Sequence, residues 1–428
     1  AWTLQKPRRG SSAWPAACTT PSVPHRGPEP DDVNALAGRS LALDAFRGAA
    51  VALMILVNNP GSWQYLYPPL AHASWHGLTP TDLVFPFFLF AVGNALAFVL
   101  PAYEAGPPAR FWGKVLQRTA GIFAVGLLLN ASPFLRWDAA TGELVWRSWE
   151  TLRWMGVLQR IALCWGAAAV LVWAFGLRGA AWAAAALLFG YWIACLALGE
   201  AGDPYSLEGF FGTAVDRAVL GAAHLYRGEG VPFDPEGLAS TVPAIAQVLL
   251  GVLAGAVLRG RTVDAQTVVR LFLWAVAAGV AGYLAHLVMP VNKKLWTSSY
   301  VLVTTALALG LLATLVALVD LGGPQRQARG VLKAGLAAVL PFGRNALFIF
   351  VLSGLVPRVL GLLRWSDGQD AEGRPRWITP LPWLYRTVFE PLTPFDPRLA
   401  SLLMALAQLA AYWALARWMD RRGLYIRL

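Results

Sequence analysis

Runs of about 20 mostly apolar residues recur along the chain, and this is the length that an α-helix needs to cross a membrane. Lipid cannot satisfy backbone N–H and C=O groups, so such runs span a bilayer as helices, in which Gly and Pro are tolerated. An additional apolar stretch, 331–341, is shorter and predicts a half-helix or an interfacial piece. Ten stretches have the full length: 41–58, 82–102, 112–131, 154–175, 180–198, 240–258, 269–289, 297–319, 345–363 and 398–417.

Composition supports the same class of fold. The 428 residues are 57% hydrophobic and 14% charged, whereas soluble domains carry about 25% charged residues. Several of the 20 Trp residues lie at the ends of apolar runs, as in the aromatic belts of membrane proteins. We therefore predict an all-α polytopic membrane protein, a bundle of about 10–11 transmembrane helices in contact with membrane lipids.

The placement of Lys and Arg predicts the orientation. Basic residues follow the second, fourth, sixth and eighth stretches and the end of the chain, which the positive-inside rule assigns to the cytoplasm together with both termini. Segment 59–81 has no Lys or Arg and is predicted to lie outside. The net charge of +11 then reflects loops that face anionic lipid, and nucleic acid is not an expected partner. These residues are Arg110, Lys114, Arg118, Arg178, Arg259, Arg261, Arg270, Arg326, Arg329, Lys333, Arg417, Arg421, Arg422 and Arg427.

The chain divides into a tail and a membrane domain. Residues 1–38 are rich in Pro, Ser, Gly and Arg and contain no apolar core of a signal peptide, which predicts a disordered tail. Residues 39–428 form the transmembrane domain. Its outer segments 132–153, 199–239 and 364–397 are long enough to roof an outward-facing cavity. Cys18, Cys164 and Cys195 show no disulfide framework and no metal-ligand spacing.

The segment between the first two apolar stretches concentrates polar and aromatic residues. It holds His72 and His76, two of only five histidines. Imidazole can take a proton from a nucleophile or carry an acyl group; alternatively, a loop histidine simply binds a backbone carbonyl. The crowding of further functional groups in the same turn favours a chemical role for His72. These neighbours are Asn58, Trp75, Thr79, Thr81 and Asp82.

Two of these neighbours have alternative interpretations. The Asn58 amide can donate to a developing oxyanion, or it can cap the end of the first helix. Asp82 can orient a histidine, although TPTD before an apolar run is also typical of a helix N-terminus. Asp234 and Glu236, in FDPEGLAST, are interpreted only as an N-terminal cap.

Charged residues inside or beside the apolar stretches are costly and indicate function or pairing. Asp44 and Arg47, in SLALDAFRG, lie on one helix face and form an internal ion pair, unless Arg47 faces an anionic ligand. GVLQRIAL places Gln159 and Arg160 inside the fourth stretch, where an arginine needs a carboxylate or a ligand phosphate. FGRNALFIF places two further polar residues, Arg344 and Asn345, at a cytoplasmic helix end.

A second polar cluster, VNKKLWTSSY, opens the eighth stretch on the outer side. Two lysines on the outer side are contrary to the positive-inside trend, and this favours a role in binding a ligand. The alternative is that they are membrane anchors whose side chains snorkel to the interface. The cluster contains Asn292, Lys293, Lys294, Trp296, Ser298 and Ser299. HExxH, P-loop, GxSxG and CxxC motifs do not occur, which disfavours a metalloprotease, an NTPase motor and a serine lipase, and we expect no metal.

These segments resemble, in the same order, the heparan-α-glucosaminide N-acetyltransferase family, above all its bacterial members related to a membrane protein named for the N-acetylglucosamine operon. The resemblance covers residues 39–420. It is carried by SLALDAFRG, NNPG, HASWHGLTPTDLVFPFFLF, GVLQRIAL, FDPEGLASTVPAIAQVLLG, VNKKLWTSSYVL and FGRNALFIF.

The resemblance implies a membrane acyltransferase that moves acetyl from cytosolic acetyl-CoA to the amine of a terminal glucosamine across the membrane. The family's functional histidine matches His72, and its asparagine matches Asn58. The chain differs from the animal enzyme at His76, where that enzyme has asparagine, and it is expected not to have the large N-terminal luminal domain of that enzyme. An amino sugar of a cell-surface glycan or a salvaged saccharide is therefore the expected acceptor, and a bacterial inner membrane and a homodimer are the expected setting.

The corresponding hypothesis places acetyl-CoA between helices, with its thioester beside His72 and its carbonyl polarised by Asn58. Trp75 and Trp296 wall the acceptor, and His72 is either a general base or the acetyl carrier. The phosphates are held by some of Arg47, Arg160, Arg344, Lys293 and Lys294. Two alternatives remain open: an amino-sugar permease, which ten apolar spans with buried charges fit equally well, and an O-acyltransferase of a glycan.

Overall fold

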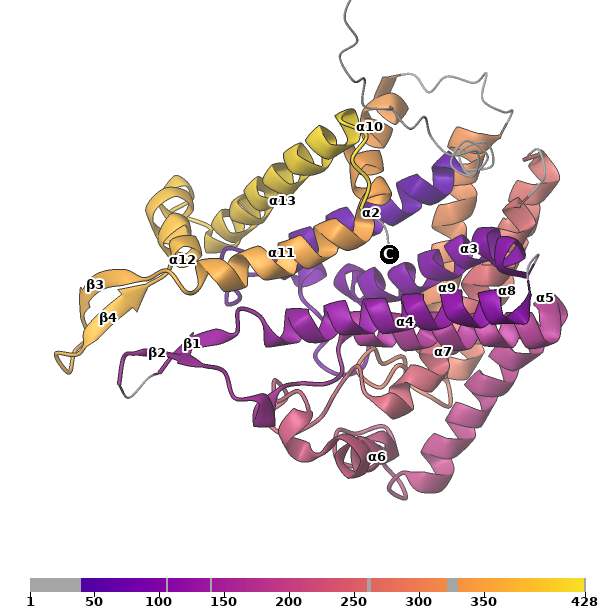
Figure 1. Ribbon diagram of the computed structural model, residues 1–428, viewed down its shortest axis with the longest axis horizontal. Coiled ribbons are helices and arrows are strands. Elements are labelled where there is room, and N and C mark those ends of the chain that lie inside the picture. The colour runs from indigo at the N-terminus through magenta and orange to yellow at the C-terminus, as the bar shows by residue number, and fades with distance from the viewer. Residues whose placement is uncertain (1–39, 105–106, 139–140, 260–262, 322–329, 427–428) are drawn as a thin grey trace, which may run out of the picture. The chain divides into compact units, whose positions relative to one another are not determined.

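The computed structural model describes residues 40–104, 107–138, 141–259, 263–321 and 330–426. The predicted disordered tail lies outside the described residues, as do four arginines used for the orientation: Arg261, Arg326, Arg329 and Arg427. Helices make up most of the described chain, with two short hairpins at its periphery (Figure 1). The prediction of an all-α polytopic membrane protein is confirmed.

The elements keep the order of the apolar stretches. The two hairpins are antiparallel and pair β1 (Leu135–Trp137) with β2 (Leu144–Trp146) and β3 (Trp365–Gln369) with β4 (Pro375–Ile378). The helices are α2 (Leu41–Asn58), α3 (Val84–Glu104), α4 (Pro108–Ala131), α5 (Val157–Leu198), α6 (Phe211–Leu220), α7 (Leu238–Leu258), α8 (Ala265–His286), α9 (Ser298–Leu315), α10 (Gly330–Arg344), α11 (Ala346–Leu360), α12 (Pro380–Leu384) and α13 (Pro397–Arg421).

Within the described residues, 7 helices are long and apolar enough to cross a membrane, or up to 8 if α10 and α11, bent by 81°, form one broken span. Ten spans were expected, and the difference lies in α4, in α5 and in the bent pair of α10 and α11. Stretch 112–131 is helical in α4, but Lys114 and Arg118 lower its mean hydropathy. Stretches 154–175 and 180–198 fall within the 42-residue α5, which is counted once although its backbone leaves the helical conformation at Gly176 with φ 65°. Glycine adopts this conformation without strain, so α5 consists of two helical segments, as expected from the two stretches.

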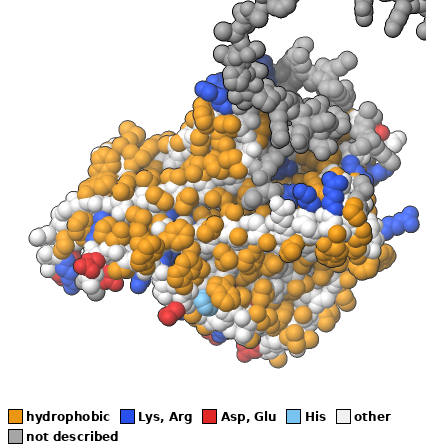
Figure 2. All heavy atoms as spheres, viewed as in Figure 1, with side chains coloured by type: hydrophobic (Ala, Val, Ile, Leu, Met, Phe, Trp, Pro, Cys, Tyr) orange, Lys and Arg blue, Asp and Glu red, His pale blue; other side chains and the backbone are white. Residues whose placement is uncertain are grey.

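Apolar side chains cover most of the surface visible in Figure 2, and charged side chains gather in a few patches. The face of α8 is an example, because Phe272, Leu273, Val276 and Val280 are all exposed. Such an extended apolar surface is expected of helices that contact lipid. The structure therefore supports a multi-pass integral membrane protein.

The connections between the helices gather at two separate ends. At the first, which we name the loop end, segments 59–81, 199–237 and 287–297 meet: the Trp75 indole donates to the Tyr205 carbonyl, and Lys294 pairs with Glu229. This grouping agrees with the predicted alternation of the chain. Which end faces the cytoplasm stays a prediction.

At the opposite end, which we name the far end, the beginning of α2 meets the ends of α9, α10 and α13. Ser40 donates to Asp320, and Arg344 pairs with Asp420.

The long segments expected to roof a cavity have different roles. Segment 199–239 reaches the site described below through Glu236. The two hairpins instead pack on each other, because the Arg364 guanidinium lies 3.7 Å from the ring centroid of Trp137 and 4.3 Å from that of Trp377.

Close helix packing depends on glycine where α3 crosses α7. A Cβ added at Gly93 would lie 2.0 Å from the carbonyl oxygen of Val248, so the two backbones approach too closely for a larger residue. We expect Gly93→Ala to destabilise the protein by about 1–3 kcal/mol through overpacking. The matched control is Gly113→Ala in α4, where a Cβ meets nothing within 4 Å and helix propensity predicts a gain of up to about 1 kcal/mol. Unfolding temperatures in detergent would compare them, and equal shifts would contradict the prediction.

Candidate active site

His72 is fixed by a carboxylate that also organises the local backbone. Pro80–Leu83 forms a short 3₁₀ turn ahead of α3, and Asp82 within it is 1% exposed. Its Oδ2 accepts from the backbone N–H groups of Ala73 and Thr79, while its Oδ1 lies 2.7 Å from His72 Nδ1. The contacts thus fit both interpretations of Asp82, helix cap and histidine partner. This arrangement directs Nδ1 of His72 toward Asp82 and leaves Nε2 for chemistry.

Lys293 joins this pair from the segment before α9. Its Nζ lies 3.0 Å from Nδ1 and 3.3 Å from Nε2 of His72, and 3.6 Å from Asp82 Oδ1. Burial lowers the pKa of Lys293, and the carboxylates of Asp82 and Glu236 only partly oppose this effect. The structure therefore brings together three residues from the two polar clusters of the sequence.

Of His72, Asp82 and Lys293, only His72 and Lys293 face a cavity. His72 and Lys293 line a cavity of about 180 Å³, together with Asn58 and Glu236. The remaining lining is mostly apolar and comes from α2, α3, α5 and α11. It consists of Met54, Val57, Thr81, Val84, Phe85, Phe88, Val157 and Phe350.

A larger cavity of about 600 Å³ lies next to it, and Asn58 lines both. Met54, Val157 and Phe350 are also shared, so the two spaces adjoin along these residues. Polar groups line the larger one, including Asn130, Arg153, Gln159, Ser353 and Arg358. The volume is in the range of small-molecule sites.

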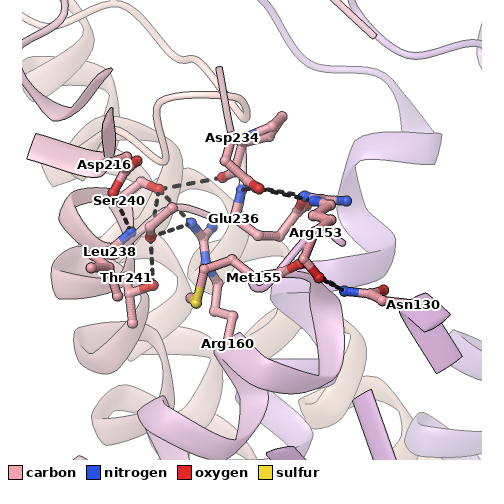
Figure 3. A network of polar contacts seen from close by, with 12 residues as sticks. Asn130, Arg153, Met155, Arg160, Asp216, Asp234, Glu236, Leu238, Ser240 and Thr241 are labelled. Carbon is pink, nitrogen blue, oxygen red and sulfur yellow. Dashed lines mark hydrogen bonds and ion pairs between the residues drawn. The ribbon is translucent and has the colours of Figure 1, made fainter. Parts of the chain in front are cut away.

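An ion-pair network borders both cavities, since Arg153 lines the larger one and Glu236 the smaller one. Figure 3 shows this network. Arg153, just before α5, donates through Nε to Asp234 Oδ2 at 2.8 Å and also pairs with Glu236. Burial alone would lower the pKa of Arg153, but the two carboxylates outweigh it and raise that pKa. Burial likewise opposes ionisation of Glu236, and Arg153 outweighs it, so the pKa of Glu236 is lowered. Arg153 and Glu236 are therefore charged, and the contacts of Arg153 with Asp234 and Glu236 tie the start of α5 to the start of α7.

Arg160 lines neither cavity. Its side chain is fully buried, donates to the Gly237 carbonyl at 3.1 Å and to the Ser240 hydroxyl, and lies 5.0 Å from the centroid of the Trp296 ring. These contacts join α5 to the start of α7 in the protein interior (Figure 3). The structure thus does not support the predicted phosphate contact of Arg160. Gln159, its neighbour, does line the larger cavity.

The two tryptophans expected to wall the acceptor lie elsewhere. Trp75 donates to the Tyr205 carbonyl and packs 6.0 Å from the Phe233 ring, and Trp296 is 1% exposed against Phe85. Neither lines a described cavity. That these two rings wall the acceptor stays a prediction.

The other polar residues of the second cluster organise the backbone around Lys293. Asn292 accepts from the Leu295 N–H and lies 3.2 Å from Nδ1 of His76, whose pKa is lowered by burial. Ser298 donates to the Leu188 carbonyl, and Ser299 contacts the Thr297 hydroxyl. These side chains position the segment rather than face the cavity.

Four predicted residues lie at the far end. Arg47 pairs with Asp44 at 3.3 Å and donates to the Gly343 carbonyl, whereas Arg344 pairs with Asp420. Asn345 holds the C-terminal segment through Leu424 and Ile426.

Arg47 and Arg344 therefore cannot share one phosphate site with Lys293 and Lys294. Helix α2 runs from the far end to the loop end, and its 18 residues separate these ends by about 27 Å. The expectation that some of the five cations hold the phosphates therefore separates into two groups, one at each end, and which group binds them stays a prediction.

Sequence reasoning missed Arg153, Glu236 and Arg358 as cavity residues. Glu236 was interpreted only as a cap, and Arg153 lies in a loop without a motif. For Arg358 a signal did exist, because it is a charged residue inside the predicted span 345–363.

Asp216, in α6, supports the same region through the start of α7. Its Oδ1 accepts from the Leu238 N–H at 2.7 Å (Figure 3), and burial raises its pKa to about 6. The native state thus keeps this proton to higher pH than the unfolded chain, so the contribution of Asp216 to stability falls as pH rises from about 4 to about 6. We expect Asp216→Asn to remove this loss, which amounts to up to about 3 kcal/mol.

Unfolding temperatures of wild type and variant at about pH 4.5, near the start of that window, and at about pH 7.5, above it, would test the sign. Asp396 is a control in which the effect of pH has the opposite sign. The Tyr67 hydroxyl lowers the pKa of Asp396, so its contribution to stability increases as pH rises. A stabilisation by Asp216→Asn that is the same at both pH values would contradict the prediction.

Comparison with known proteins identifies the relatives of the chain. No protein-family model matches it. It is 30% identical over 346 residues to the human heparan-alpha-glucosaminide N-acetyltransferase. This alignment covers 68% of this chain and 50% of that protein. The mouse heparan-alpha-glucosaminide N-acetyltransferase is 29% identical over 349 residues, covering 69% of this chain and 51% of that protein. The chain spans about half the length of these curated relatives. Over the aligned part, the chain belongs to the heparan-alpha-glucosaminide N-acetyltransferase family.

Proposed function

We propose that the protein is a multi-pass membrane acetyltransferase that moves acetyl from acetyl-CoA to the amine of glucosamine or a related amino sugar. The names of the human and mouse relatives support N-acetyl transfer to a glucosaminide. The observation that carries the proposal is the geometry of His72, which is held by Asp82 and shares a cavity with Asn58. We further propose a bacterial inner membrane as its location and a homodimer as its assembly.

In the proposed reaction, the Asp82 carboxylate accepts a hydrogen bond from Nδ1–H of His72 and so keeps Nε2 as the basic nitrogen. The acceptor amine attacks the thioester carbonyl, and Nε2 takes a proton from the nitrogen as the C–N bond forms. The Asn58 amide donates to the oxygen that becomes negative. The C–S bond then breaks, and His72 returns the proton to the thiolate, which yields the amide and free CoA.

Transfer through an acetyl-imidazole on His72 is the alternative route. We favour the base route because a thioester is already activated and a free amine is a good nucleophile. The adjoining cavities suit it, since donor and acceptor can occupy neighbouring spaces that meet at Asn58.

The proposal is tested with purified protein in detergent. We expect acetyl-CoA to raise the unfolding temperature, and a panel of amino sugars to yield acetylated products by mass spectrometry. Uptake of sugar into proteoliposomes without any CoA requirement would favour the permease instead. Products acetylated on oxygen would favour the O-acyltransferase.

Asn58→Ala tests the oxyanion contact. Removal of one such donor from other enzymes costs about 10²–10³ in kcat, and we expect a loss of this size. KM should change little, because the interaction forms in the transition state. A raised KM at unchanged kcat would instead show that Asn58 only binds substrate.

A further inference from the structure

The side chain of Lys293 places a nucleophilic atom, Nζ, next to the imidazole ring of His72. Its Nζ lies within 3.3 Å of both ring nitrogens of His72. Its side chain is 21% exposed and lines the cavity that also contains Asn58. An amine at this place lies where the acceptor amine is proposed to react.

The position of Lys293 is fixed by its backbone. The Trp296 N–H donates to the Lys293 carbonyl, and Thr297 closes the same turn onto Asn292. The adjacent Lys294 points away from His72, with its ammonium 2.7 Å from Glu229 and 2.8 Å from the Ser74 carbonyl. Two consecutive lysines thus differ in their partners and in their access to the cavity.

We propose that Lys293 is a self-acetylation site, to which the protein transfers acetyl from acetyl-CoA when no acceptor sugar is bound. This inference rests on the proposed acetyltransferase function. It adds a covalent modification of the protein to that function.

The reaction balances in the same way as transfer to a sugar. The neutral Nζ attacks the thioester carbonyl, an N–C bond forms and the C–S bond breaks. One amine proton passes to Nε2 of His72, 3.3 Å away, and then to the CoA thiolate. The products are N-acetyl-lysine and free CoA, and no further reactant is needed.

The charges around Lys293 are consistent with a reactive amine. Asp82 and Glu236 favour its ammonium form and Lys294 disfavours it, while burial lowers its pKa overall. A larger fraction of neutral amine is therefore present than in an exposed lysine, and lysines that are shifted in this way act as nucleophiles.

Acetylation would also alter the site. It removes the cation that lies 3.6 Å from Asp82 and adds an acetyl group to a cavity of about 180 Å³. We therefore expect incubation with acetyl-CoA alone to cause a progressive loss of transfer activity.

The test is to incubate the purified full chain with acetyl-CoA, without acceptor, and to locate acetyl groups by peptide mass spectrometry. Lys293 should be acetylated at least about tenfold faster than Lys294, and His72→Asn should slow the modification of Lys293 at least about a hundredfold. Acetic anhydride added to a separate sample shows that both peptides are detected. Equal acetylation of the two lysines, or modification that is unaffected by His72→Asn, would overturn the inference.

The inference can fail separately from the proposed function. An unmodified Lys293 in protein that acetylates glucosamine would refute self-acetylation alone. If acetyl-CoA modified neither lysine nor sugar, the function and the inference would fall together. Lys293→Arg adds a second readout: the ratio of activity after to before preincubation with acetyl-CoA should stay near one in this variant and fall in the wild type.

Discussion

Replacement of His72 by asparagine is expected to reduce kcat/KM for acetyl transfer by about 10²–10⁴-fold, the range for the loss of a general base. Asparagine can still donate an amide N–H to Asp82, as Nδ1 of His72 does at 2.7 Å, but it has no basic nitrogen at the position of Nε2. The variant thus separates proton transfer from the structural contact. Rates with saturating acetyl-CoA and an amino-sugar acceptor would measure the effect.

Stability and a neighbouring histidine provide the controls. The His72 side chain is 45% exposed, so the unfolding temperature of His72→Asn should stay close to that of the wild type. His76 lies on the same segment but contacts Asn292 and lines neither cavity. His76→Asn should therefore retain most of the activity. If both variants lose activity equally, the segment matters only for structure.

Arg153→Ala is expected to cause the largest loss of stability, about 3 kcal/mol. The side chain of Asp234 is 0% exposed and that of Glu236 is 14% exposed, so removal of Arg153 leaves two carboxylates without their cation in the interior. Breaking a buried ion pair in this way typically costs about 3–5 kcal/mol. We choose the lower value because the Arg153 side chain is itself 26% exposed. Thermal unfolding in detergent would measure it.

A second ion pair of the same chain is the matched control. Arg386 pairs with Asp367 near the hairpin of β3 and β4, with the arginine 45% exposed. Solvent weakens such a pair, so Arg386→Ala should lower the unfolding temperature much less than Arg153→Ala. Glu236→Gln in the Arg153→Ala background should recover part of the loss because it removes one unpaired charge. Equal losses in the two arginine variants would contradict the assignment of a buried network.

Much of the fold follows from local sequence. Hydropathy over about 20 residues identifies a membrane helix, and the stretches found in this way correspond to helices throughout the described residues. Stretches 154–175 and 180–198 were predicted as two segments, and the non-helical backbone at Gly176 does separate them inside α5. Hydropathy does not report whether two apolar runs are joined by a bend or by a loop.

The candidate site followed from sequence only in part. His72 and Asn58 were selected from one loop and do share a cavity, although their chemical roles remain proposals. Arg47 and Arg344 were grouped with Lys293 because all are basic and lie near helix ends. The structure places the two arginines at the far end, paired with Asp44 and Asp420.

Apolar helices around a loop with His72 could be predicted from the sequence, because helix formation and membrane insertion depend on neighbouring residues. The contact of Lys293 with His72, 221 positions away in the chain, and the pairing of Arg153 with Asp234 and Glu236 became visible only in the folded chain. Such contacts arise where helix packing brings distant loops to the same end. Local patterns carry no information about them.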